Sequence, residues 1–207
     1  QGLVLYLPFD EGSGTIAKDY SGNNNHGTLV NNPQWVDGKV GKALSFDGAD
    51  DWAEVASVAQ LRDIYTVAAW IYNIRPITER LVTGYFISRG SGAINEYDSF
   101  GITGTYAPPA GRLLLFNGTA AIFGTKILNV NEWYFVTFVR SGTYVKLYLN
   151  GISEGQGNLP ITYNATKIIT GVRTDQEWRF KGFIDEVRIY NRALSDEEIK
   201  ALYEATK

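Results

Sequence analysis

The chain is 207 residues long, 14% of them aromatic, and its formal net charge is −3. A mildly acidic chain without a block of Lys or Arg is not expected to bind nucleic acid, and the absence of cysteine excludes a disulfide framework and a thiol-based active site. The length fits one large β domain over residues 1–207 better than two small domains, and 22 glycines can supply turns between many short strands.

The first predicted element is an apolar strand at residues 3–9, which ends at Asp10 and Glu11. It is much shorter than the ~20 residues that a membrane-spanning helix requires, so we expect no membrane insertion. It also lacks the basic flank and the cleavage site of a signal peptide. We therefore interpret it as the first strand of the fold.

The loop at residues 19–27 is rich in oxygen-bearing side chains, with Asp19, Ser21 and three asparagines in nine residues. Carboxylate, amide and backbone oxygens in a flexible curl are the ligands that Ca²⁺ prefers, so the loop is a candidate cation site. The alternative is a turn in which these side chains hydrogen-bond to their own backbone without a metal. His26 is the sole histidine, which leaves zinc or histidine-based catalysis without ligands.

Two runs rich in aromatic and β-branched residues, 65–72 and 133–140, predict central strands. Both are apolar on each side, so we expect the face turned away from the partner sheet to be covered or to serve as a binding platform. Between them, residues 87–111 contain many glycines and two prolines. This composition predicts a loop-rich stretch, where functional residues often lie.

Two hairpins are indicated by Asn-Gly pairs. Residues 144–151 alternate between apolar and polar side chains and end in Asn150-Gly151, which favours a tight primed turn. Residues 113–116 followed by Asn117-Gly118 repeat this pattern. Regular turns without a long linker favour an all-β sandwich.

The last predicted strand covers residues 183–190. Phe183, Val187 and Ile189 alternate with polar residues and predict one apolar side, which Asp185 interrupts. A carboxylate on the buried side of a strand needs a partner. Asp185 is therefore a candidate functional residue.

A short helix is predicted after this strand. Ser195 and Glu198 form a capping-box pattern, with Leu194 and Ile199 at the positions of a hydrophobic staple. The helix carries an apolar stripe that must pack on the body of the domain. The sequence therefore predicts an all-β, two-sheet antiparallel sandwich that ends in a short C-terminal α-helix.

Six blocks of sequence, in order along the chain, carry a resemblance to a known family: residues 5–14, 19–27, 38–48, 66–71, 147–151 and 183–194. Together they resemble the laminin-G-like (LamG) branch of the concanavalin A-like lectin/glucanase superfamily. The resemblance implies a jelly-roll β-sandwich, often secreted and appended to enzymes or surface proteins that act on polysaccharides.

The resemblance also implies a structural calcium ion. Relatives commonly hold it through a loop of this type and an aspartate of the closing strand. Carried over to this sequence, the predicted ligands are Asp19, Asn23, Asn25, the carbonyl oxygen of His26, and Asp185.

Candidate sugar-binding residues follow from the chemistry of glycans, which stack on aromatic rings and hydrogen-bond to charged or amide groups. Trp178 has polar neighbours that are unusual for a core strand, and Arg173 lies close to it in sequence. An aromatic residue in a β-sandwich is more often part of the core, and that alternative stays open. The further candidates are Tyr148, Arg89, Tyr97 and Asp98.

These observations favour a non-catalytic, calcium-stabilised carbohydrate-binding module, extracellular or at the cell surface, forming a monomeric part of a larger glycan-acting or surface protein. Its expected partner is a polysaccharide or oligosaccharide. The alternative is a structural or adhesive module that binds a protein partner. A glycoside hydrolase or polysaccharide lyase is disfavoured, because Asp185 and Glu186 are adjacent and a strand would turn them to opposite sides.

Overall fold

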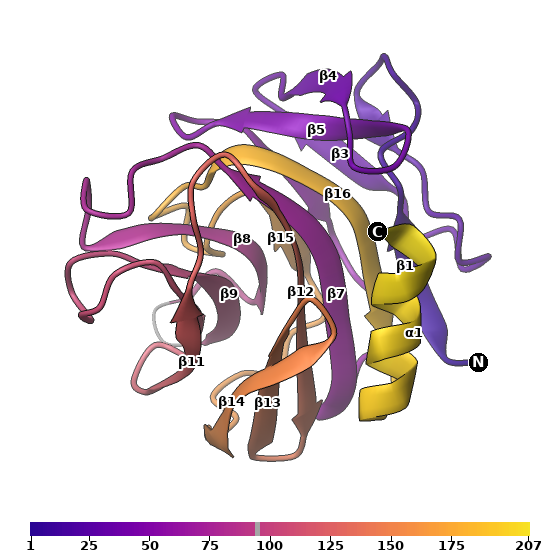
Figure 1. The fold of residues 1–207 in the computed structure, drawn as a ribbon. Coiled ribbons are helices and arrows are strands. Elements are labelled where there is room, and N and C mark those ends of the chain that lie inside the picture. The colour runs from indigo at the N-terminus through magenta and orange to yellow at the C-terminus, as the bar shows by residue number, and fades with distance from the viewer. Residues whose placement is uncertain (94–95) are drawn as a thin grey trace.

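A computed structural model describes residues 1–93 and 96–207, which form two antiparallel β-sheets and one C-terminal helix (Figure 1). In order across the first sheet lie β14 (Ile152–Asn158), β13 (Tyr144–Leu149), β12 (Trp133–Ser141), β7 (Ile64–Asn73), β16 (Lys181–Tyr190), β5 (Lys42–Asp47) and β4 (Gln34–Asp37), and β1 (Leu3–Leu7) pairs with β16. In order across the second lie β11 (Ala121–Ile127), β10 (Arg112–Phe116), β9 (Tyr97–Thr103), β8 (Val82–Gly90), β15 (Ile168–Thr170), β6 (Trp52–Val55), β3 (Gly27–Val30) and β2 (Ile16–Ala17). The predicted sandwich is confirmed.

The main hydrophobic core lies between the two sheets, where side chains from alternate positions of each strand meet. The alternation is clear in the two predicted central strands. Val67, Ala69 and Ile71 of β7 and Val136 and Phe138 of β12 belong to this core. Both strands lie inside the first sheet, as predicted.

The outer face of the first sheet is covered by α1 (Asp196–Thr206). Trp70 and Phe135, which point away from the main core, pack with Tyr203 of the helix. The predicted capping box is present, since Glu198 N donates to Ser195 Oγ at 3.3 Å and Ser195 N donates to the Glu198 carboxylate at 3.0 Å. Among the described residues, no helix has the length and apolar character needed to cross a membrane.

Both hairpins predicted from Asn-Gly pairs are confirmed. Asn150 and Gly151, with φ of 51° and 78°, make the tight turn between β13 and β14. At the other hairpin the connection between β10 and β11 is longer, because Asn117 N donates to Ala120 O and closes a turn over residues 117–120.

Two expectations about individual segments were wrong. The stretch at residues 87–111, predicted to be loop-rich, contains β9 and the end of β8. Gly101 in this stretch allows two strands to pack closely, since a Cβ there would lie 2.4 Å from Gly84 O.

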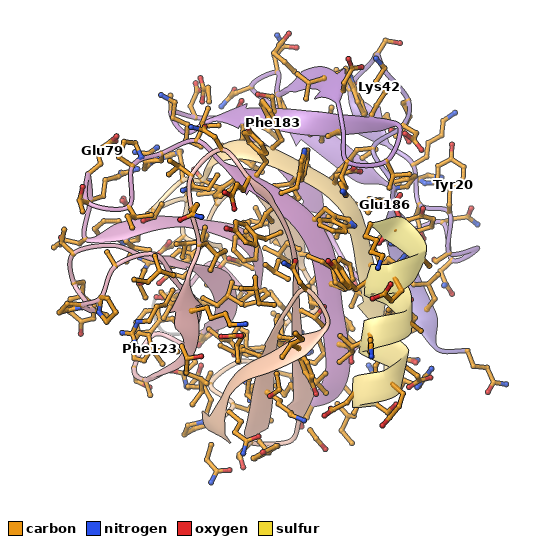
Figure 2. All side chains as sticks on the ribbon, in the orientation of Figure 1. Tyr20, Lys42, Glu79, Phe123, Phe183 and Glu186 are labelled. Carbon is orange, nitrogen blue, oxygen red and sulfur yellow. The ribbon has the colours of Figure 1, made fainter. Side chains whose placement is uncertain are left out.

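The second expectation concerns the predicted apolar side of β16. In this strand Glu186 has φ 56° and the register shifts between Asp185 and Arg188. This bulge changes which side of the strand each residue occupies. Phe183, labelled in Figure 2, therefore lies outside the core and stacks on Tyr72, with ring centroids 5.1 Å apart.

Candidate functional site

A pocket of about 500 Å³ lies on the outer face of the second sheet. It exists because β8 and β10 are apolar on both faces. Phe86, Leu113 and Leu115 enter the core, whereas Tyr85 and Leu114 point to the opposite side. The lining is mainly aromatic and aliphatic and consists of Leu81, Val82, Tyr85, Thr103, Tyr106, Ala107, Leu114, Phe116, Thr119, Ala120, Ala121, Phe123, Arg173 and Trp178.

Trp178 closes one wall of this pocket from the segment before β16. Its carbonyl oxygen accepts a hydrogen bond from Tyr85 N at 3.0 Å, which ties the segment to β8. Its φ of 56° lies in the left-handed region, which is unfavourable for a bulky residue. Backbone strain of this kind costs about 1–3 kcal/mol and clusters at functional sites. The backbone is thus held in an unfavourable conformation at the residue that brings an indole ring to the pocket.

Arg173 is held in place on three sides. Its Nε and Nη2 donate to the two carboxylate oxygens of Asp175 at 2.7 and 2.6 Å. Its guanidinium carbon lies 5.2 Å from the ring centroid of Tyr97 and 5.9 Å from that of Tyr85. Burial by itself lowers the pKa of Arg173, but the hydrogen bond to Asp175 and the nearby tyrosines outweigh it, so the net shift is upward.

The structure therefore brings together three of the six predicted sugar-binding residues. Trp178 and Arg173 line the pocket. Tyr97 is only 2% exposed, and its ring packs against the Arg173 guanidinium. The other three lie elsewhere and are buried.

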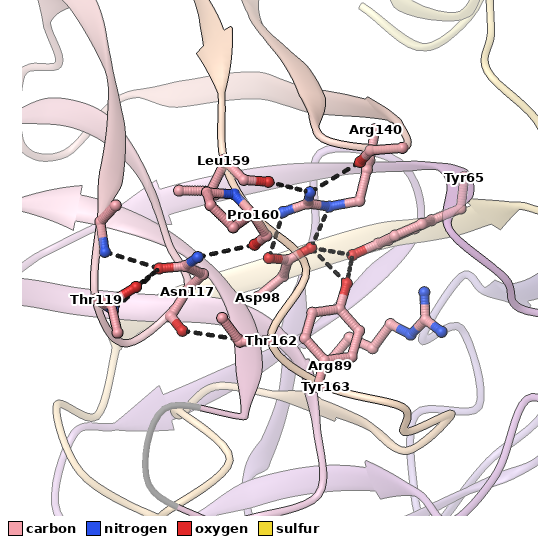
Figure 3. Close-up of polar contacts among 12 residues, drawn as sticks. Tyr65, Arg89, Asp98, Asn117, Thr119, Arg140, Leu159, Pro160, Thr162 and Tyr163 are labelled. Carbon is pink, nitrogen blue, oxygen red and sulfur yellow. Dashed lines mark hydrogen bonds and ion pairs between the residues drawn. The ribbon is translucent and has the colours of Figure 1, made fainter.

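Asp98 lies between the two sheets, in a buried polar cluster (Figure 3). Its carboxylate accepts hydrogen bonds from Arg140 Nε and Nη2, each at 2.6 Å, and from the hydroxyl groups of Tyr65 and Tyr163, also at 2.6 Å. Arg89 packs against the same two tyrosines, with its guanidinium carbon 4.7 and 5.0 Å from the ring centroids. Arg89 and Asp98, which the sequence suggested as sugar-binding residues, are therefore too buried to contact a sugar in this structure.

The turn that carries Thr119 and Ala120 to the pocket is held by the buried side chain of Asn117. Asn117 Nδ2 donates to Pro160 O at 2.8 Å, and Asn117 Oδ1 accepts from the backbone N of Thr119 and Ala120 (Figure 3). Thr119 and Ala120 line the pocket. A buried side chain thus fixes the turn that forms one wall.

Tyr148, a further candidate for sugar binding, does not reach the surface. It points away from the main core, as the alternation in β13 predicted, but the C-terminal helix covers it to 2% exposure. Its hydroxyl group donates to Asp196 Oδ1 at 2.6 Å, so the residue anchors the start of α1.

The loop at residues 19–27 satisfies its own polar groups. Asp19 Oδ1 accepts from the backbone N of Tyr6 and Ser21, and Asp19 Oδ2 accepts from Ser21 Oγ and Asn25 N, all at 2.8–2.9 Å. A carboxylate offers about four lone-pair positions, so those of Asp19 are all used. His26 Nδ1 accepts from Asp19 N at 2.9 Å.

The amides of this loop tie it to the first strand. Asn25 Nδ2 donates to Val4 O at 2.8 Å, and Asn23 Nδ2 donates to Leu3 O at 3.3 Å and to Ser21 Oγ at 2.9 Å. Within residues 1–93 and 96–207, no group of three or more His, Cys, Asp or Glu side chains is arranged to hold a metal ion. These are local hydrogen bonds of the kind that Asp and Asn side chains form with nearby backbone, and calcium binding by this loop stays a prediction.

Asp185 contacts a different segment, the turn between β4 and β5. Its Oδ2 accepts from Val40 N at 2.9 Å, whereas its buried Oδ1 has no hydrogen-bond partner among the described residues. The side chain is fully buried, and this burial raises its pKa to about 7. A buried, unpartnered carboxylate oxygen is costly, and a bound cation would satisfy it.

Sequence reasoning missed most of the pocket lining. Leu114 and Phe116 lie in a run in which every residue is apolar, and such a run signals a strand with two covered faces. That signal was available at β10. No comparable pattern marks Phe123, which reaches the pocket because β11 pairs with β10, or Tyr106, which lies in the connection between β9 and β10.

Comparison with known proteins gives one family. Residues 47–200 match the family Laminin_G_3, described as the concanavalin A-like lectin/glucanases superfamily. No curated protein matches the sequence.

Among solved structures, the chain is similar to domain 4 of AbnA, a GH43 extracellular arabinanase from Geobacillus stearothermophilus, in complex with arabinotriose (TM-score 0.76, 23% identity, 97% of this chain and 98% of that one). It is also similar to the binding domain of Paraclostridial Mosquitocidal Protein 1 (TM-score 0.71, 20% identity, 99% and 52%). A third is the binding domain of Botulinum Neurotoxin DC in complex with SialylT (TM-score 0.72, 16% identity, 100% and 51%). At these identities the similarity establishes the fold.

Proposed function

Since the chain belongs to the concanavalin A-like lectin/glucanases superfamily, we propose that it is a non-catalytic carbohydrate-binding module and that the pocket at Trp178 is its site. The observation that carries the proposal is the strained Trp178 in the wall of an aromatic pocket on an open sheet face. Aromatic rings bind the apolar C–H faces of sugars, and hydroxyl and guanidinium groups bind their rim. Thr103, Thr119 and Arg173 supply such groups here.

The pocket volume of about 500 Å³ fits a small oligosaccharide segment within the usual range of ligand sites. Similar folds in solved structures carry arabinotriose or SialylT, which supports a glycan ligand without identifying it. The described lining contains aromatic, aliphatic, hydroxyl and guanidinium groups, which are suited to binding, and it contains no carboxylate or imidazole, the groups that most often transfer protons. An extracellular or cell-surface setting, as a monomeric module of a larger protein, is part of the proposal.

The experiment is affinity gel electrophoresis on a panel of soluble polysaccharides, followed by calorimetry with the best ligand. We expect Trp178→Ala to weaken binding by up to about tenfold, since stacking on an aromatic ring contributes about 0.5–1.5 kcal/mol. Tyr20→Ala is the matched control, because Tyr20 is 57% exposed and lies on the opposite side of the molecule from Phe123 in Figure 2. Thermal melting of both variants checks that they fold.

Equal binding by Trp178→Ala and the parent chain would move the site away from this pocket. Failure to bind any glycan, with the pocket variants folded, would favour the alternative of an adhesive module that places an apolar side chain of a protein partner in the pocket.

We also propose a structural calcium ion at Asp185. The unpartnered, buried Oδ1 supports this residue as a ligand, and backbone carbonyl oxygens of the adjacent turn would be suitable further donors. The hydrogen bonds of Asp19 speak against that residue as a ligand in the present conformation. The ion would neutralise a buried charge and thereby stabilise the junction of β16 with the turn between β4 and β5.

A further inference from the structure

The charged groups close to the pocket are mainly guanidinium groups. Arg173 is the single charged residue in the described lining. Arg80 lies over the Trp178 ring, with its guanidinium carbon 5.6 Å from the ring centroid, and Arg112 lies over the Phe123 ring at 5.1 Å. Cations in such positions are attracted by the ring, which holds them at the edge of the pocket.

Two of these charges are not neutralised. None of the ion pairs found in residues 1–93 and 96–207 includes Arg80 or Arg112. Arg112 donates to the carbonyl oxygens of Ala107, Pro108 and Pro109, which orient it without cancelling its charge.

Three acidic residues pair with the groups at the pocket or adjoin them in the chain, namely Asp175, Glu79 and Glu177. Asp175 is paired with Arg173, and Glu79 is paired with Arg75 at 2.9 Å. Glu177 is exposed, where water screens its charge. The charge around the pocket is thus positive, although the net charge of the chain is −3. A local electrostatic field of one sign favours ligands of the opposite sign.

We infer that the glycan bound in this pocket is acidic and that Arg173 donates hydrogen bonds to a sugar carboxylate. The inference rests on the proposed function and names the chemical class of its ligand. Asp175 accepts from Nε and from one N–H of Nη2 of Arg173, which leaves the edge made by Nη1 and the second N–H of Nη2 for another acceptor. A planar guanidinium matches a planar carboxylate in two parallel hydrogen bonds.

The matched ligands are polymers that differ only at the carboxyl group. Polygalacturonate is compared with its methyl ester, and hyaluronan with its carboxyl-reduced form; neutral galactan and dextran sulfate complete the set. Charge-assisted hydrogen bonds predict about 10- to 100-fold tighter binding of a free carboxylate than of its masked form. This preference should shrink when the salt concentration is raised.

Two variants test the residues. Arg80→Gln is expected to reduce the preference for the free carboxylate severalfold, and Arg173→Lys should reduce it further, because Lys keeps the charge but loses the planar pair of donors. Arg62→Gln is the control, since within residues 1–93 and 96–207 the Arg62 side chain donates to the carbonyl oxygens of Ala59 and Leu61 and does not line the pocket. Thermal melting verifies folding in each case.

The outcomes separate the two proposals. Equal affinity for free and masked carboxyl groups, unchanged in Arg80→Gln, would overturn the acidic ligand and leave the carbohydrate-binding function intact. Dextran sulfate bound as tightly as the best carboxylate polymer would overturn the assignment of a carboxylate. Binding to none of these polymers or of the wider glycan panel would overturn both the inference and the proposed function.

Discussion

Replacement of Asp98 by Asn should strongly destabilise this protein. Asp98 and Arg140 have side chains that are 0% exposed and lie 2.6 Å apart, in β9 and β12 of opposite sheets. Burial by itself lowers the pKa of the Arg140 guanidinium, but the Asp98 carboxylate more than compensates, and the net shift is upward. Asp98→Asn keeps the size of the side chain and removes the charge, so that Arg140 stays charged without a counter-ion.

The expected loss follows from this burial. Breaking a fully buried ion pair by removing one partner costs about 3–5 kcal/mol, because the other charge remains in a region of low dielectric constant. Asn also places an N–H group where Asp98 accepts hydrogen bonds from Tyr65, Tyr163 and Arg140, so one of these donors loses its acceptor. Such a loss is a large part of the 5–15 kcal/mol that stabilises a typical domain.

The assay is urea denaturation followed by tryptophan fluorescence, with the free energy of unfolding extrapolated to water. Asp37→Asn is the matched control, since Asp37 pairs with Lys42 at the same kind of distance, 2.7 Å, but its side chain is 92% exposed. This exposed pair should contribute little, because water screens it. A loss in Asp98→Asn no larger than that in the control would refute the argument that burial makes the Asp98–Arg140 pair critical.

Three further outcomes are expected. Burial raises the pKa of Asp51 to about 6, above its unfolded value near 3.9, so the folded state binds the proton more tightly. The free energy of unfolding should therefore fall as the pH rises from about 4 to about 6. Urea denaturation of Asp51→Asn should show a weaker dependence of this free energy on pH, and an unchanged dependence would exclude Asp51 as its source. Ser195→Ala removes the acceptor for Glu198 N and should cost about 1 kcal/mol by the same assay, whereas no change would show that α1 is held by packing alone. Calcium at a hundredfold over its dissociation constant should add about 2.7 kcal/mol of stability relative to chelator; Asp185→Asn should abolish this difference, and a melting temperature that ignores chelator in the parent chain would contradict a calcium site.

The elements that the sequence predicted well depend on interactions between residues close together in the chain. The capping box joins positions three residues apart, and the turn at Asn150 and Gly151 follows from the ease with which these residues adopt positive φ. The two-faced apolar runs at β7 and β12 likewise predicted central strands. In each case the physical cause acts within a few residues.

The site residues were predicted unevenly for the same reason. Trp178 stood out because its sequence neighbours are polar, and it does line the pocket. Tyr148 alternates correctly in β13, yet alternation gives only the face of the sheet and not what covers it. Asp98 was a candidate for the sugar site because it follows Tyr97 in a stretch that was predicted to be loop-rich. Its burial could not be predicted from these neighbours, because its partner Arg140 is 42 residues away in the other sheet.

The amino-acid sequence by itself determined the β-sandwich, its hairpins, the capped C-terminal helix and the presence of a surplus of aromatic residues, because periodicity, turn chemistry and capping are local. Only the tertiary structure decided which aromatic faces are covered by α1 and which remain open at the pocket, where the bulge at Glu186 directs Asp185, and that Asp98 pairs with Arg140. These outcomes depend on the order of strands in two sheets and on contacts between segments far apart in the chain. Their free energies arise from burial and desolvation, which no local pattern specifies.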